Sequence, residues 1–337
     1  QVLRITGQGV SSDALAAGAE GGDALRPEVV WGSEGLQGIL ARADITVCVV
    51  DVHHKMLLGL LPKLWAAQKH VLSHSPLAYD LDTARRLLAL YQDLPPGVSR
   101  PAWHALESAR FEDALTIAGE SLERVGRPLC ISMVTVIPQT AALRGSHVPL
   151  EEQMAIELVH GLVVAQRVTQ DRLASISCQV GEQPPQAQPG EQAVPPPARR
   201  EQVLAGHFVL SAPTARVAVT TGTFLVCRSG AEPRLELRLH CARGSLVLKR
   251  ERSAWQLTVT DDHAGAFGRK SLERSVPCVG YRNSHDAFLK QVRTRGASGA
   301  QSVDISLEYA LVDTAVLGSV LSSMHLNGRT MAFKYAS

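Results

Sequence analysis

The chain has 337 residues, of which 45% are hydrophobic and 20% charged, so it is long and apolar enough for two domains of ordinary size. Its 34 basic residues nearly balance its 32 acidic ones, and a net charge of +2 excludes the basic stripe that binds a nucleic-acid backbone. The longest apolar runs, 56–61 and 309–321, are too short or too interrupted for a membrane span of about 20 residues, so we expect a soluble protein.

The six cysteines contain no C-x-x-C pair, and five of them lie in or beside strand-like runs. This pattern is typical of reduced, buried thiols in an intracellular protein rather than of a disulfide framework. No N-terminal segment resembles a signal or transit peptide. The cysteines are Cys48, Cys130, Cys178, Cys227, Cys241 and Cys278.

The first element predicted in chain order is a strand, QVLRIT, at residues 1–6. Gly7 and Gly9 follow it with the first spacing of a phosphate-binding G-x-G-x-x-G turn, but the third glycine is absent. The distance onward to the strand at 43–52 is too short for two full strand-helix units. We interpret residues 1–6 as the second strand of a doubly wound domain whose first strand, glycine turn and first helix are missing. The alternatives are that the protein never had them and that the two glycines are ordinary turn residues.

Strands and helices then alternate along the chain. The strand ADITVCVVDV at 43–52 is apolar almost throughout, as expected for a parallel strand that is covered on both faces. A helix at 55–68, the strand HVLSH at 70–74 and an amphipathic helix at 81–94 follow it. This order is typical of an α/β domain with a parallel sheet, which we assign to residues 1–125.

From 126 to 337 the sequence changes to strands separated by turns, with few helices. The strands predict an α+β domain with a large open, mainly antiparallel sheet. Apolar residues alternate on both sides of Gly244, as in a half-buried antiparallel pair. The segment at 181–201 is rich in Pro, Gln and Glu and has too few apolar side chains to offset the entropy of ordering. We expect a mobile insertion there; docking on a partner's aromatic groove is the alternative.

The stretch KHVLSHSPLAYD at 69–80 carries the most informative pattern of the chain. Its order of strand, helix, Lys-His-Val, short polar corner, Pro-Leu-Ala and new helix resembles the Gfo/Idh/MocA family, the glucose-fructose oxidoreductase and inositol dehydrogenase group. Arg110 and Phe111, which open a helix, and Gly126 and Pro128, which lead into a strand, extend the resemblance to nearly the whole chain. It implies a Rossmann-like first domain that binds NAD(P) and a second domain whose open sheet commonly mediates oligomerisation.

The corner of this pattern is altered. In the family it reads Glu-Lys-Pro, and the matching positions here are His74, Ser75 and Pro76, so the proline is kept while the Glu and the Lys are lost. The end of the preceding strand, at 51–54, usually carries a proline and a later histidine near the cofactor and is altered too. The residues that the resemblance places at the cofactor are Asp51, His53, His74, Ser75 and Pro76.

The resemblance also implies which groups move a proton during hydride transfer: the corner Lys, helped by an Asp and a His one helical turn apart in the second domain. Ser75 cannot replace the lysine, because a hydroxyl with no adjacent base keeps its proton and the side chain is several atoms shorter. The matching His is His160, but the Asp position is Ile156, with Glu157 one place along and about 100 degrees around the helix. His74 is a further candidate proton donor, because an imidazole titrates close to neutral pH. The alternative for His160 is a core histidine with one satisfied hydrogen bond.

Four histidines, His53, His54, His70 and His74, also have the composition of a zinc site at neighbouring strand ends. No Cys or carboxylate stands at ligand spacing beside them. The adjacent His53 and His54 would face opposite ways on a strand. We therefore expect no metal.

Two functional hypotheses follow. The first is a degenerate, non-catalytic protein of the oxidoreductase family that acts as a scaffold, regulatory or complex subunit and still binds a nicotinamide dinucleotide. The second is an active NAD(P)-dependent oxidoreductase on a sugar or another small hydroxy or carbonyl compound, with His160 and either His74 or Glu157 as proton carriers. In both cases we expect a homo-oligomer or a subunit of a larger assembly, formed through the C-terminal sheet, with no nucleic acid as partner.

Overall fold

The computed structural model divides the chain into two compact units. Unit 1 combines residues 1–107 with residues 284–315, and unit 2 combines residues 108–283 with residues 316–337. These units do not coincide with the sequence-based division at residue 125, because residues 284–315 return to unit 1. The structure describes residues 2–6, 32–94, 100–138, 149–183, 201–212, 219–229, 232, 234–262, 270–298 and 305–333.

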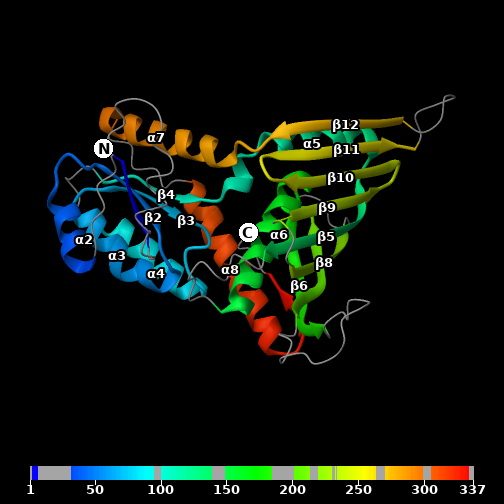
Figure 1. Ribbon diagram of the computed structural model, residues 1–337, viewed down its shortest axis with the longest axis horizontal. Helices are drawn as coiled ribbons and strands as arrows, with labels where there is room; N and C mark the ends of the chain where they lie inside the picture. The colour runs from blue at the N-terminus through cyan, green and yellow to red at the C-terminus, as the bar shows by residue number, and fades with distance from the viewer. Residues whose placement is uncertain are drawn as a thin grey trace, which may run out of the picture. The chain divides into compact units, whose positions relative to one another are not determined.

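Unit 1 is built on a four-stranded sheet in the order β1-β2-β3-β4, in which all neighbouring strands are parallel (Figure 1). The strands are β1 (Val2–Thr6), β2 (Val47–Asp51), β3 (His70–His74) and β4 (Trp103–Leu106). The helices between them are α2 (Gly32–Ala41), α3 (His54–Ala66) and α4 (Leu81–Gln92). The alternation of strand and helix confirms the predicted Rossmann-like α/β fold.

β1 pairs directly with β2. In the doubly wound order 3-2-1-4-5-6 the second strand pairs with the first and the third. No other strand of the described sheet lies between β1 and β2. Gly7 and Gly9 lie outside the described residues, and the interpretation of residues 1–6 as a second strand stays a prediction.

Alternate side chains of the parallel strands point to opposite faces and fill two separate cores. Cys48 and Val50 of β2 lie in the larger core, with α3, α4 and Leu307 of α8 (Ile305–His325). Leu72 of β3 and Leu106 of β4 lie in the smaller core, with Phe288 of α7 (Gly280–Ser298). Both faces of the sheet are therefore covered, which is why these strands are apolar almost throughout.

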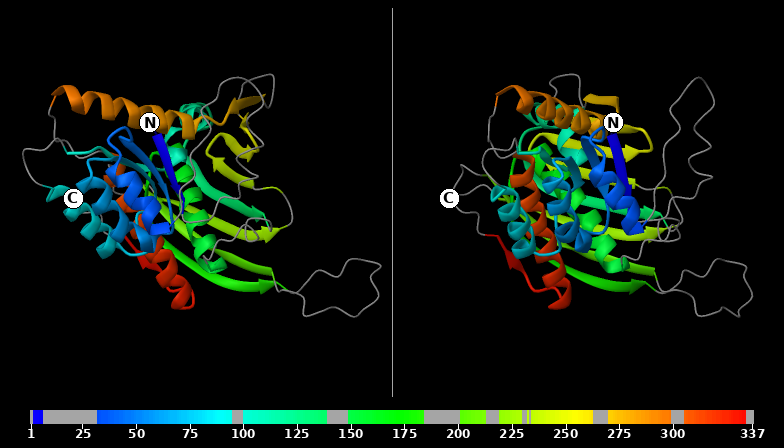
Figure 2. Two further views of the ribbon diagram at one scale, coloured as in Figure 1. Left: turned by 60° about the vertical axis from the view of Figure 1, so that its left-hand side comes forward. Right: turned by 90° about the vertical axis from the view of Figure 1, so that its left-hand side faces the viewer.

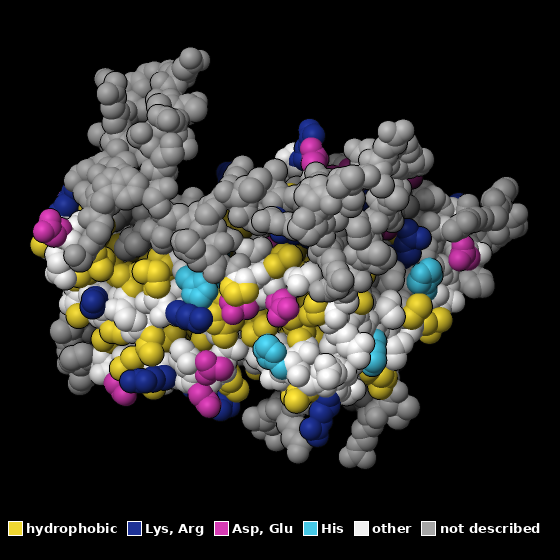
Figure 3. Space-filling view, turned by 60° about the horizontal axis from the view of Figure 1, so that its bottom comes forward, with side chains coloured by type: hydrophobic (Ala, Val, Ile, Leu, Met, Phe, Trp, Pro, Cys, Tyr) yellow, Lys and Arg dark blue, Asp and Glu magenta, His cyan; other side chains and the backbone are white. Residues whose placement is uncertain are grey.

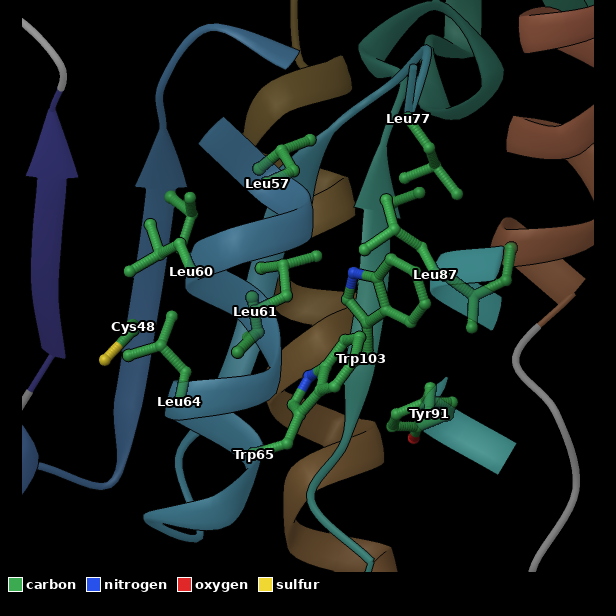
Figure 4. Close-up of a cluster of buried hydrophobic side chains, with 14 of the residues drawn as sticks. Cys48, Leu57, Leu60, Leu61, Leu64, Trp65, Leu77, Leu87, Tyr91 and Trp103 are labelled. Atoms are coloured by element: carbon green, nitrogen blue, oxygen red, sulfur yellow. The ribbon is translucent and has the colours of Figure 1, made fainter. Parts of the chain in front are cut away.

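Three aromatic side chains lie close together in the larger core (Figure 4). The ring centroids of Trp65, Tyr91 and Trp103 are 4.9 to 5.3 Å apart. Trp103 Nε1 donates to Ser73 Oγ at 3.0 Å, and the Tyr91 hydroxyl donates to the Pro101 carbonyl at 2.7 Å, so both of these rings satisfy their polar atoms inside the core.

Unit 2 is built on a nine-stranded sheet in the order β12-β11-β10-β9-β5-β8-β7-β6-β13 (Figure 2). Only β5 and β8 are parallel neighbours among these strands, and the other described pairs are antiparallel. This confirms the predicted large open, mainly antiparallel sheet. Its strands are β5 (Pro128–Pro138), β6 (Arg172–Gln183), β7 (Glu201–Ser211), β8 (Val219–Ser229), β9 (Arg234–Cys241), β10 (Gly244–Glu251), β11 (Ala254–Asp261), β12 (Lys270–Pro277) and β13 (Met331–Ala332).

Two helices that follow the short 3-10 helix η1 (Ser108–Phe111) pack on this sheet, and the C-terminal part of α8 also contacts β6. The two helices are α5 (Asp113–Val125), which contacts β10 and β11, and α6 (Leu150–Thr169), which contacts β5 to β9 (Figure 1). Gly161 lets α6 lie close to β5, because a Cβ there would stand 2.5 Å from Met133 Sδ. The predicted strand pair around Gly244 is confirmed as the β9–β10 hairpin. A Cβ at Gly244 would stand 1.9 Å from the Thr260 carbonyl oxygen, so no larger residue fits.

The six cysteines are thiols, and not all of them are buried. Cys48, Cys178 and Cys241 are buried, whereas Cys130 is exposed, because its side chain lies on the opposite face of β5 from the buried Ile131. The expectation of uniformly buried thiols is therefore wrong at Cys130.

Part of the predicted Pro-rich insertion, at 184–200, lies outside the described residues. Among the described helices, none is long and apolar enough to cross a membrane. On the face drawn in Figure 3, lysine and arginine side chains of the described residues lie among acidic and apolar ones rather than in one continuous stripe.

Candidate functional site

The candidate site of unit 1 lies at the carboxyl edge of its parallel sheet. Parallel strands end at the same edge, and in open α/β sheets ligands bind outside the carboxyl ends of the strands. β2 ends at Asp51, and His53 follows it. β3 ends at His74, and Ser75 and Pro76 follow it. The structure therefore brings all five residues that the resemblance assigns to the cofactor to the ends of two adjacent strands.

The corner, residues 74–76, turns through a cis peptide bond between Ser75 and Pro76. The Ser75 backbone N–H donates to the Leu106 carbonyl at 3.0 Å, which ties the corner to the end of β4. The Ser75 hydroxyl donates to Asp313 Oδ2 at 2.9 Å. Ser75 and Asp313 are 3% and 1% exposed, so this hydrogen bond is shielded from water.

Asp313 corrects one expectation about the corner. The sequence suggested that Ser75 has no adjacent base, whereas a buried carboxylate stands within hydrogen-bond distance of its hydroxyl. An aspartate carboxylate is a far weaker base than a serine alkoxide, so Ser75 keeps its proton and donates it to Asp313. The corner serine is a hydrogen-bond donor with a fixed partner, and it is not an activated nucleophile or base.

His74 and Asp51 form an imidazole-carboxylate pair across the ends of β3 and β2. His74 Nε2 stands 3.7 Å from Asp51 Oδ1, and both side chains are half-exposed. A half-exposed imidazole can exchange protons with a ligand or with solvent. This pair is the titratable group that the altered corner still offers.

His53 is held by two hydrogen bonds at the start of α3. Its Nδ1 accepts from the Lys55 backbone N–H at 3.3 Å, so the side chain caps the helix. With Nδ1 accepting, the neutral ring carries its proton on Nε2, which lies 3.0 Å from the Tyr79 hydroxyl. The His54 ring packs edge-on against the Tyr79 ring, with centroids 5.1 Å apart. Tyr79 therefore links the segment after β3 to the segment after β2.

The histidines do not gather as candidate metal ligands. His70 begins β3, and its Nδ1 accepts from the Ala102 backbone N–H at 2.8 Å, so it lies at the other end of the strand from His74. His53 and His54 were expected to face opposite ways on a strand, but they lie at the start of α3 with ring centroids 6.1 Å apart. Within the described ranges, no group of three or more His, Cys, Asp or Glu side chains is arranged to hold a metal ion.

The other two predicted catalytic residues, Glu157 and His160, belong to α6 in unit 2. They stand three positions apart, so their side chains are neighbours on one side of the helix, and both are half-buried. Ile156 stands in the position of the expected acid and is half-buried too. The helix thus carries a carboxylate and an imidazole side by side, with the carboxylate displaced by one residue from the family pattern.

Three contributors to the site were missed by sequence reasoning: Tyr79, Asp313 and Thr314. Thr314 Oγ1 accepts from the Leu77 backbone N–H at 3.1 Å. The available signal was Asp313 itself, a lone carboxylate in the apolar run LVDTAVLGSVL. A charge on an otherwise apolar helix needs a hydrogen-bond partner when it is buried, although the sequence does not name that partner.

No protein-family model matches the sequence. Dehydrogenase FPY6 of Fusarium mangiferae is 32% identical over 100 residues, which are 30% of this chain and only 28% of that protein. The oxidoreductase from Sinorhizobium meliloti superposes with a TM-score of 0.60 at 11% identity, covering 88% of this chain and 83% of the other. The myo-inositol dehydrogenase from Lactobacillus casei, in complex with NAD(H) and myo-inositol, gives a TM-score of 0.57 at 16% identity, covering 90% and 81%. Levoglucosan dehydrogenase, in complex with NADH and levoglucosan, gives 0.60 at 15% identity, covering 89% and 83%.

These likenesses establish the fold, which the chain shares with the solved oxidoreductase and dehydrogenases named above. The fold implied by the sequence resemblance is confirmed in both parts, the Rossmann-like parallel sheet and the large open sheet.

Proposed function

We propose that this protein is an oxidoreductase-fold protein that binds a nicotinamide dinucleotide at the carboxyl edge of its parallel sheet without turning over substrate, and that it serves as a scaffold, regulatory or complex subunit. The observation that carries the proposal is the Ser75–Asp313 hydrogen bond. Ser75 stands in the place of the family's lysine and has no amine. The hydrogen bond also commits its hydroxyl to a buried partner, so this side chain does not move a proton.

Two observations support the dinucleotide. The strand ends that carry Asp51, His53 and the corner form the edge where open α/β sheets bind ligands. Solved structures with this fold include dehydrogenases in complex with NADH or NAD(H). The hydroxyl of Tyr79 and the His74–Asp51 pair supply polar groups at that edge.

The proposal is tested by titrating the full chain with NADH and with NADPH, following nicotinamide fluorescence. We expect saturable binding of at least one of them and no oxidation or reduction with a panel of sugars and polyols. A Ser75→Lys variant places a long cation at the corner, so it should change the dissociation constant if the dinucleotide lies there. Ser271→Lys, on an exposed position of β12, is the matched control and should leave it unchanged.

Failure of both dinucleotides to bind would reject the cofactor part of the proposal. Turnover of any substrate in the panel by the natural protein would reject the non-catalytic part. A change in binding by Ser271→Lys as large as that by Ser75→Lys would show that the effect is not local to the corner.

The His74–Asp51 pair favours a second candidate function, an active NAD(P)-dependent oxidoreductase on a sugar or related compound. A bound oxidised dinucleotide would supply the hydride acceptor, and His160 with either His74 or Glu157 would carry the proton of the substrate hydroxyl. A His74→Asn variant should then lose turnover while keeping dinucleotide binding. Unchanged turnover in that variant would exclude His74 as the proton carrier.

We also propose that the sheet of unit 2 forms the contact of a homo-oligomer or a larger assembly. Along β5 and β8, the half-exposed Val134, Val136 and Leu225 alternate with buried side chains, and Val134 and Leu225 are register partners. Half-exposed apolar residues on adjacent strands suit a protein contact. Light scattering during gel filtration measures the mass of the protein in solution. If the Leu225→Arg variant has the same oligomeric mass as the natural protein, this surface is not the oligomer contact.

A further inference from the structure

The corner is fastened to a helix that lies far from it in sequence. The Leu77 backbone N–H donates to Thr314 Oγ1 at 3.1 Å, and the Ser75 hydroxyl donates to Asp313 Oδ2 at 2.9 Å. The partners are 237 and 238 positions apart, and both α8 residues belong to the same compact unit as the corner. Two adjacent residues of α8 therefore hold the residues on both sides of the cis Pro76 bond.

The hydroxyl of Thr314 has a fixed orientation. It donates its proton to the Ala310 carbonyl at 2.8 Å, so its oxygen is left to accept, and it accepts from the Leu77 N–H. Thr314 is 0% exposed, so water cannot substitute for it. Without this hydroxyl the buried Leu77 N–H would lose its acceptor. Other conformations of the corner, in which that N–H finds a partner, would then become more favourable than the present one.

We infer that Asp313 and Thr314 are positioning residues that hold the corner in the conformation that binds the dinucleotide, an inference that rests on the proposed function. Their contribution to binding is indirect, because they act through Ser75 and Leu77. A binding-competent conformation that is populated only in part lowers the apparent affinity by that fraction. Loosening the corner should therefore raise the dissociation constant of NADH.

Ser323 provides a matched control on the same helix. It is also a 0% exposed hydroxyl that accepts a backbone N–H, from Cys178 at 3.0 Å, but it belongs to unit 2. Thr314→Val and Ser323→Ala each remove one buried hydroxyl that accepts one backbone hydrogen bond. A purely structural role predicts similar consequences for the two variants.

The experiment compares Thr314→Val, Thr314→Ser and Ser323→Ala in the full-length chain by NADH titration and by native-state hydrogen exchange of residues 74–80. We expect Thr314→Val to raise the NADH dissociation constant about tenfold, as it would if the competent fraction fell to about a tenth. Thr314→Val should also speed hydrogen exchange of the Leu77 amide more than Ser323→Ala does. The two variants are compared under conditions in which their global free energies of unfolding are equal. Thr314→Ser keeps the hydroxyl and should restore both properties.

The two readouts separate this inference from the proposed function. Equal exchange at Leu77 in Thr314→Val and Ser323→Ala would overturn the positioning role, whatever NADH does. Faster exchange in Thr314→Val together with no NADH binding by the natural protein would support the fastening of the corner and reject the dinucleotide. Faster exchange with an unchanged NADH dissociation constant would overturn the link between the fastening and binding.

Discussion

Burial raises the pKa of four cysteine side chains, Cys48, Cys178, Cys241 and Cys278. Desolvation raises the pKa of Cys48 and of Cys241 from 9.0 to about 11, because the thiolate would have to form away from water. A folded-state pKa above the unfolded one means that the folded protein holds these protons more tightly. Their stabilising contribution is complete below pH 9.0 and is lost as the pH rises towards about 11.

We therefore expect the urea midpoint of unfolding to fall over this range of alkaline pH. A Cys48→Ala variant should show a shallower fall than the natural protein, because one of the buried thiols no longer titrates. Ser271→Ala, at an exposed position of β12, is the control and should leave the slope unchanged. An identical slope in the Cys48→Ala variant would show that the thiol does not titrate differently in the folded and unfolded chains.

The residues of the site differ in how far the sequence reveals them. His74 ends β3, and Ser75 and Pro76 follow it, in the order that the sequence pattern predicts, because position at the end of a strand is a local property. The hydrogen bond from Ser75 to Asp313 spans 238 positions, and no local spacing encodes it. Long-range partners of this kind require the topology that brings α8 back to the first sheet.

The helix after the corner depends on its first turn. Asp80 is its N-cap, and Asp80 Oδ1 accepts from the Thr83 backbone N–H at 2.7 Å. We expect Asp80→Ala to lower the free energy of unfolding by about 1 kcal/mol, and Asp80→Asn to recover most of it, since the amide oxygen can still accept. Denaturant unfolding measures both.

Asp82 is the control for that prediction. It is also acidic and in the first turn of α4, but its side chain is 95% exposed and forms an ion pair with Arg85 at 3.8 Å. Asp82→Ala should change stability by less than about 0.5 kcal/mol. Equal losses in the Asp80 and Asp82 variants would mean that charge near the helix start, rather than the cap, stabilises α4.

The elements themselves were predictable where one periodicity extends over a whole segment. The helices expected at 55–68 and 81–94 are α3 and α4, each within two residues of both predicted ends. The strand at 43–52 begins later than expected, at Val47. Its first residues are apolar enough to read as strand, but the sheet neighbours of β2 pair only from Val47 onward.

On the scale of the whole molecule, the first sheet depends on the last quarter of the chain. Phe288 of α7 is 1% exposed and packs with Leu72 and Leu106 on one face of that sheet. We expect Phe288→Ala to lower the free energy of unfolding by about 3 to 5 kcal/mol, because it leaves a cavity in the core. Guanidinium unfolding followed by tryptophan fluorescence measures this loss, since Trp103 belongs to the same sheet.

Leu272→Ala, at a 43% exposed position of β12, is the control and should cost about 1 kcal/mol or less. If the Phe288 variant loses no more than this control, α7 does not support the first sheet. The sequence does not predict this role, because periodicity shows that a helix has an apolar side and does not show which sheet that side covers.

The return of residues 284–315 to unit 1 has a consequence for biosynthesis. A ribosome that has released the chain only as far as residue 283 has not yet made Phe288, Ser306 or Thr314. The nascent β4 then lacks the Ser306 hydroxyl that accepts from its Ala105 backbone N–H at 3.1 Å, and one face of the sheet is still bare. Unit 2 also waits for residues after 315. Domains that are contiguous in sequence can fold during synthesis as soon as they have been made. Here unit 1 is complete only after residue 315 and unit 2 only after the residues that follow it, so the apolar strands of both units need chaperones until then.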